Sequence, residues 1–161
     1  MIVIRVKVFG QKKAEKICRK LNGRNDKKCV VISITDPGQS LADIHTGGAV
    51  YDIFRMSFYD LETDVKFLRG FYPCATIGDL RGLRTFVDKW RDVDVLIVHC
   101  AAGISRSAAV AAAIEQYLGL EDTIRSHFFY HPNGHVFKLC LDEFGLTKSE
   151  EYYSSVFVDV I

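Results

Sequence analysis

A cysteine and an arginine six positions apart lie between an apolar segment and an alanine-rich one. The apolar run at 95–98 leads into His99 and Cys100, and Arg106 and Ser107 precede the alanine-rich run. An apolar run followed by helix-forming residues predicts a strand, a short loop and a helix. Cys100 is therefore expected where the strand ends and the loop begins.

A loop of this kind can bind an oxyanion. The first N–H groups of a helix have no partner within the helix, and they can converge on an anion. Gly103 allows backbone shapes that other residues resist, and Arg106 supplies a planar fork of donors. The same positive potential favours the thiolate of Cys100. These residues predict a sulfur nucleophile beneath a bound oxyanion, an arrangement suited to attack on phosphorus.

A purely structural role explains these residues less well. Cys100 could pack as a small apolar core residue. That interpretation leaves His99, Gly103, Arg106 and Ser107 without a purpose. An arginine at a helix start also opposes the helix dipole, so Arg106 indicates an anionic ligand that offsets this cost.

The elements that would position the loop alternate along the chain. We expect strands at 2–9, 29–34, 50–60 and 94–99, and a final strand at 154–161. We expect helices at 11–22, 76–90, 105–118 and 133–145, the second opened by a capping box between Thr76 and Asp79.

This alternation predicts an α/β fold with a mostly parallel central sheet flanked by helices. Ligands bind such sheets at the carboxyl ends of the strands, where Cys100 is expected. A length of 161 residues and a hydrophobic fraction of 48% suit a single domain over 1–161.

Bulk charge and cysteine content limit the partners. With 21 basic and 20 acidic residues the net charge is +1, so we expect no nucleic-acid partner. No apolar run has the length of a membrane span, and we expect no membrane partner. Five cysteines without a C-x-x-C pair favour a reduced, cytoplasmic location over a disulfide framework.

The motif His99-Cys100-x-x-Gly103-x-x-Arg106-Ser107 resembles the signature of the cysteine-dependent protein tyrosine phosphatases. The stretch "HCAAGISRSAAV" is most similar to the dual-specificity-like branch and its small prokaryotic relatives. Looser similarity extends over about residues 28–146 and includes "HPNGHVFKLCLDEFG". The resemblance implies a phosphatase-like three-layer sandwich.

The resemblance also implies roles for the motif residues. Cys100 would take up the phosphoryl group, Ser107 would donate a hydrogen bond to its sulfur, and His99 would orient the loop. The phosphate oxygens would be held by Arg106 and by loop amides, those of Ala101, Ala102, Gly103, Ile104, Ser105 and Arg106. The substrate would be a phosphorylated protein or peptide carrying phosphotyrosine, with phosphoserine and phosphothreonine left open. We expect no metal or other cofactor.

The leaving group needs a proton, which the family takes from an aspartate upstream of the cysteine. Asp60 lies 40 residues before Cys100 and directly follows the strand-like stretch "FRMSFY", so it is preferred. Asp64 is the alternative, because spacing alone does not fix a loop. Asp79 is better explained as a helix-start residue.

Two other classes of function stay open. A phosphate-binding pseudophosphatase would keep the loop without catalysis, and a sulfurtransferase or arsenate reductase would use a similar oxyanion loop. Relatives in the similar family that act on multiply phosphorylated inositol lipids tend to carry basic residues in this loop. The stretch "AAGIS" has no lysine, so the resemblance disfavours that substrate class. His127, His131 and His135 recur every four residues, but Pro132 and Gly134 interrupt any helix that could present them to a metal. The sequence does not decide whether Cys74 or Cys140 has a redox role.

Overall fold

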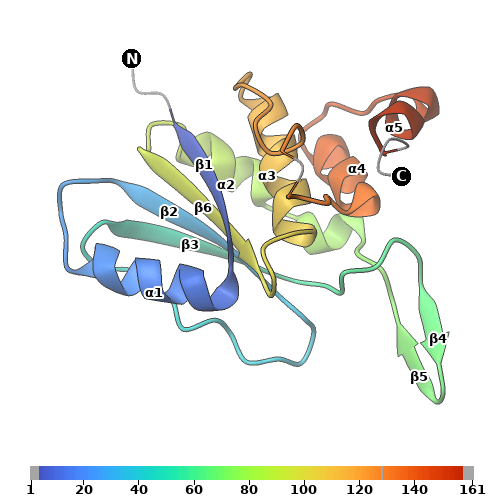
Figure 1. Cartoon of the computed structure of the whole chain (residues 1–161), viewed down its shortest axis with the longest axis horizontal. Coiled ribbons are helices and arrows are strands. Elements are labelled where there is room, and N and C mark those ends of the chain that lie inside the picture. Colours follow the sequence, from blue (N-terminus) through green and yellow to red (C-terminus); the bar gives the residue numbers. More distant parts are fainter. Residues whose placement is uncertain (1–3, 128, 158–161) are drawn as a thin grey trace.

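The computed structural model describes residues 4–127 and 129–157 (Figure 1). In chain order, the elements are β1 (Arg5–Gly10), α1 (Gln11–Asn22), β2 (Cys29–Thr35), β3 (Val50–Ser57), β4 (Val65–Phe67), β5 (Gly70–Tyr72), the 3₁₀ helix η1 (Ile77–Leu80), α2 (Leu83–Lys89), β6 (Val95–Cys100), α3 (Arg106–Tyr117), α4 (Gly134–Glu143) and α5 (Glu150–Phe157).

The central sheet has the strand order β1-β6-β2-β3, and every pairing is parallel. β6 therefore lies inside the sheet, between β1 and β2. Its register pairs Cys100 with Gly10 on β1 and His99 with Ser33 on β2. The carboxyl ends of these strands thus meet at one edge of the sheet, where the loop after β6 begins.

Helices cover both faces of the sheet, which confirms the predicted α/β fold. Helix α1 packs on one face through Ala14, Cys18 and Leu21, as its apolar spacing predicts. Helices α2, α3 and α4 pack on the other face (Figure 1). The result is three layers, with the sheet in the middle.

Helix α3 is the most deeply placed helix of the chain. Its residues from Arg106 to Glu115 are all buried between the sheet and α4. Glu115 accepts hydrogen bonds from the backbone N–H groups of Thr123 and Ile124, so the buried carboxylate holds the segment after the helix. The first turn of α3 therefore has little freedom to move.

The predicted helix over 76–90 is wrong as one element. The capping box is present, with the N–H of Thr76 donating to Asp79 at 2.8 Å, but it opens η1. The chain then turns at Gly82, whose φ of 90° lies in the left-handed region. Leu80 and Leu83 are nevertheless buried as the pattern predicts, because both short helices face the same core.

Two further segments differ from expectation. Residues 150–157 form α5, so the predicted strand over 154–161 is wrong for its first half, and its remainder lies outside the described residues. The hairpin β4–β5 was not predicted, because its strands have three residues each. The hairpin projects from the body of the molecule (Figure 1). Among the described residues, no helix has the length and apolar character needed to cross a bilayer.

Ile32, at the centre of β2, is fully buried against the α3 side of the sheet. We predict that Ile32→Ala lowers the free energy of unfolding by about 2–5 kcal/mol, because a cavity replaces the lost side chain. The matched control is Leu41→Ala, whose side chain is 63% exposed and should change stability by less than about 0.5 kcal/mol. Urea unfolding measures the free energy of unfolding of both variants. Equal losses of stability in the two variants would contradict the assignment of Ile32 to the core.

Candidate active site

The loop after β6 is fixed from behind by the first strand. Gly103 has a φ of 72°, and a Cβ atom there would lie 2.4 Å from the nitrogen of Gly10 and 2.5 Å from the carbonyl carbon of Phe9. The N–H of Gln11 donates to the carbonyl of Ala101 at 3.2 Å. Only glycine permits both this conformation and this approach, so the third residue of the loop positions the whole loop against β1.

Cys100 lies at the base of the loop and is 3% exposed. Its Sγ is 3.1 Å from Oγ of Ser107 and accepts the N–H of Gly103 at 3.3 Å. Burial alone would raise the pKa of the thiol, but the hydrogen bonds from Ser107 and Gly103 and the charge of Arg106 together lower the pKa. The site therefore favours a thiolate.

The pKa values of the other four cysteine thiols are shifted in the opposite direction, upward. Burial raises the pKa of Cys18 to about 11, and it also raises the pKa of Cys29, Cys74 and Cys140. All five thiols are free. Cys100 is thus the one cysteine whose surroundings lower the pKa of its thiol.

Arg106 is held by two acceptors, and its buried Nε donor is unused. Its Nη1 donates to Asp36 at 2.5 Å and to the carbonyl of Phe58 at 2.7 Å. Its Nε is buried and has no hydrogen-bond partner among the described residues. A buried donor without a partner is costly, so this atom indicates an acceptor that a ligand would bring.

Asp36 is a residue that the sequence analysis missed. It directly follows β2, just as the loop directly follows β6, and the two strands are neighbours in the sheet. The signal available in the sequence was an acidic side chain immediately after a buried strand. Its contact with Arg106 places the guanidinium beside the loop.

His99 lies beneath the loop and is fully buried. Its Nε2 is 2.7 Å from Oγ of Ser33, the residue paired with it across the sheet, and its Nδ1 is 3.4 Å from the carbonyl of Cys100. Burial is the main cause that lowers the pKa of His99, so the ring is neutral at physiological pH. This geometry suits orientation of the backbone rather than proton transfer.

Asp60 contacts the loop, whereas the other candidate acids do not. Its Oδ1 accepts hydrogen bonds from Oγ of Ser105 and from Nδ2 of Asn133, each at 2.8 Å. Asn133 also caps α4 by accepting the N–H of Val136, so it ties the helix to the Asp60 loop. The carboxylate is thereby fixed next to the loop that follows β6.

Asp64 and Asp79 have structural partners instead. Asp64 accepts the N–H of Cys74 at 2.9 Å, and this hydrogen bond is the main cause of its lowered pKa. That contact ties the two ends of the β4–β5 hairpin together. Asp79 completes the capping box with Thr76.

A cleft of about 330 Å³ opens beside these groups. Arg106, Asp36 and Asp60 line it, together with an apolar wall formed by Tyr59, Leu61, Val65 and Tyr72. The rings of Tyr59 and Tyr72 meet edge to face, with centroids 5.4 Å apart. Tyr72 comes from the unpredicted hairpin, which explains why the sequence did not reveal this wall.

Two of the three spaced histidines contact backbone carbonyl groups. Nε2 of His135 is 2.7 Å from the carbonyl of Ala75, and the N–H of His131 donates to the carbonyl of Ile104. Within residues 4–127 and 129–157, no group of three or more His, Cys, Asp or Glu side chains could hold a metal ion.

The fold matches a solved human structure, that of a tyrosine phosphatase-like serine/threonine/tyrosine-interacting protein. The identity is 16%, the match covers 84% of this chain and 85% of that one, and the TM-score is 0.51. The chain has a tyrosine-phosphatase-like fold. At this identity the likeness establishes the fold, and it agrees with the three-layer sandwich that the motif implies.

Further matches have lower TM-scores. Tk-PTP in its active form is 16% identical over 99% of this chain and 93% of that chain, with a TM-score of 0.41. PTPMT1 in complex with PI(5)P is 15% identical over 98% and 95%, with a TM-score of 0.49. No protein-family model and no curated protein matches the chain.

The hydrogen bond from Ser107 should control how reactive Cys100 is. We predict that Ser107→Ala raises the pKa of the Cys100 thiol, so that its alkylation by iodoacetamide slows several-fold at mildly acidic pH. Mass spectrometry of the alkylated peptides measures the rate across pH. Cys74, which is partly exposed, provides an internal control whose rate should not change. Unchanged alkylation of Cys100 would contradict the proposed role of Ser107.

Proposed function

We propose that this protein is a phosphatase that hydrolyses phosphotyrosine in proteins or peptides through a cysteinyl-phosphate intermediate. The observation that carries the proposal is the hydrogen bonding of Cys100. Its sulfur accepts from Gly103 and lies against Ser107, beside an arginine with an unused buried donor. A thiolate beneath an oxyanion site is the arrangement that attack on a phosphate ester requires.

In the first step the thiolate of Cys100 attacks phosphorus. The S–P bond forms while the ester P–O bond breaks, and the protonated carboxyl of Asp60 gives its proton to the leaving oxygen. Arg106 and the loop N–H groups, those of residues 101–106, stabilise the charge on the transferred oxygens. The contact of Asp60 with Ser105 supports this assignment, because it holds the carboxyl at the loop.

In the second step water cleaves the intermediate. The carboxylate of Asp60 removes a proton from a water molecule, whose oxygen attacks phosphorus, and the S–P bond breaks. Inorganic phosphate leaves, and the thiolate of Cys100 returns to its hydrogen bond with Ser107. The ester and one water thus give the free phenol of tyrosine and phosphate, with no cofactor consumed.

The cleft favours a phenyl ester. Tyr59 and Tyr72 form an aromatic wall next to Arg106, which suits contact with the ring of phosphotyrosine. Asp36 and Asp60 line the same cleft, so a substrate with several phosphate groups would meet carboxylates. This distribution of charge supports a singly phosphorylated side chain as the substrate.

Hydrolysis of p-nitrophenyl phosphate tests the proposal directly, because its leaving group scarcely needs an acid. We predict that Cys100→Ser lowers kcat by about 10³-fold or more. Arg106→Lys should lower kcat by about 10²–10³-fold, since an ammonium cannot reproduce the forked contact. The proposal would be contradicted if the wild-type protein bound a phosphotyrosyl peptide but hydrolysed neither that peptide nor p-nitrophenyl phosphate. That result would indicate a phosphate-binding module.

The role of Asp60 is tested by comparing leaving groups. We predict that Asp60→Asn slows hydrolysis of phenyl phosphate by about 10²–10⁴-fold but that of p-nitrophenyl phosphate much less. Asparagine keeps the oxygen acceptor that Ser105 and Asn133 contact, so the loop should stay in place. Asp64→Asn is the matched control. If the control shows the selective loss instead, Asp64 is the acid.

A further inference from the structure

The strand β1 forms one edge of the central sheet. It pairs with β6 on one side, and no described strand pairs with it on the other. The N–H of Arg5 donates to the backbone carbonyl of Asp94, on the β6 side. Because successive residues of a strand direct their backbone groups to opposite edges, those of Val6 and Val8 face outward. An edge of this kind is a template for another strand.

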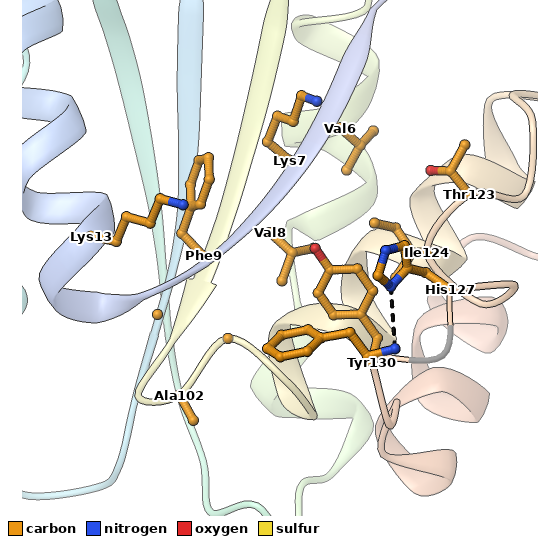
Figure 2. Close-up of a pocket in the computed structure, with 13 residues that line it drawn as sticks. Val6, Lys7, Val8, Phe9, Lys13, Ala102, Thr123, Ile124, His127 and Tyr130 are labelled. Carbon is orange, nitrogen blue, oxygen red and sulfur yellow. Dashed lines mark hydrogen bonds between the residues drawn. The ribbon is translucent and has the colours of Figure 1, made fainter. Parts of the chain in front are cut away.

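A cavity of about 470 Å³ follows this open edge (Figure 2). Five consecutive residues, 6–10, line one side of the cavity, and residues of the 123–130 segment line the other. A second cavity of about 260 Å³ lies along residues 4–7 and shares Val6, Lys7 and Thr123 with the first. Together the two cavities run along the whole of β1, a length of about 20 Å.

The opposite edge of the sheet, formed by β3, lies against the end of α2. On β3, the carboxylate of Asp52 accepts the indole N–H of Trp90 at 3.0 Å and pairs with Lys89 at 3.6 Å. The ring of Trp90 also meets Tyr51 edge to face. Side chains from the end of α2 thus contact those of β3, whereas the edge of β1 borders two cavities.

The two sides of the β1 edge differ in chemistry (Figure 2). Val6 and Val8 lie on the side of Ile124 and Tyr130, and Lys7 and Phe9 lie on the side of Lys13. Nζ of Lys13 lies 5.1 Å from the centre of the Phe9 ring, and both lysines are exposed. No acidic residue lines the larger cavity, whereas Glu115 and Glu121 line the smaller one, so the basic side of the edge lies at Lys7 and Lys13. An added strand with apolar residues on one face and acidic residues on the other would match both sides.

Charge argues against a second copy of this chain as the occupant. Pairing two β1 edges would bring Arg5 and Lys7 of one copy near the same residues of the other, and like charges across paired strands are destabilising. The favourable occupant is acidic.

We propose that the outer edge of β1 binds an extended acidic peptide of another protein, which adds as a fifth strand to the sheet. Its backbone pairs with Val6 and Val8, and its carboxylates lie near Lys7 and Lys13. The peptide ends behind the phosphate-binding loop, because Gly10 and Gly103 line the same cavity. The proposal does not depend on the phosphatase activity, since the cavity lies behind the loop.

The test uses a blocked hexapeptide of alternating valine and glutamate, labelled with a fluorophore, and the full chain. We expect saturable binding at concentrations below about 1 mM. Replacing Lys7→Glu and Lys13→Glu together should weaken binding about tenfold or more. The matched control, Lys16→Glu with Lys20→Glu, changes the net charge equally on exposed positions outside the cavity and should bind like wild type. Thermal unfolding verifies that both variants fold.

Residue-resolved amide exchange by NMR tests the mode of binding. Bound peptide should slow exchange of the N–H groups of Val6 and Val8 by about tenfold or more, because both become hydrogen-bonded. The N–H of Lys7, already directed to β6, should change little. Absence of binding, equal weakening by both double variants, or binding without protection of Val6 and Val8 would each overturn the proposal. None of these measurements uses phosphatase activity, so a failure here leaves the proposed function unaffected.

Discussion

A sulfur anion persists inside a protein only where donors and positive charge replace the water that it loses. Cys100 meets this condition through Ser107, the N–H of Gly103 and the charge of Arg106. The guanidinium can contribute only if it is itself held, and Asp36 holds it from the end of the neighbouring strand. The chemistry of one thiol thus depends on groups from separate parts of the chain.

The parallel register of the sheet brings these groups together. Strands that run in the same direction end at the same edge, so β1, β2 and β3 each place a residue next to the loop that follows β6. Gly10 supports the loop from behind, Ser33 contacts the buried histidine, and Asp60 contacts Ser105. The three-layer fold buries the first turn of α3, which keeps the arginine in place.

The sequence predicted what is local and missed what depends on distant partners. The motif from His99 to Ser107 lies in consecutive positions, so its strand, loop and helix were all predictable. Asp36 can contact Arg106 only because β2 lies beside β6, and no spacing in the sequence specifies that pairing. The hairpin strands are too short for an alternating pattern, and Gly82 divides an apolar stripe that continues across it. The terminal segment alternates like a strand, yet its described part is helical, because local alternation over a few residues is weak beside tertiary packing.

The most direct test is a crystal structure of the protein with orthovanadate, an oxyanion that adopts the geometry of phosphoryl transfer. The account predicts a bond between vanadium and Sγ of Cys100. It also predicts equatorial oxygens within hydrogen-bond distance of the loop N–H groups and of Nε of Arg106, for which residues 4–127 and 129–157 offer no hydrogen-bond partner. Vanadate bound elsewhere, or a loop in which Nε of Arg106 stays unpaired beside an unbonded sulfur, would contradict it.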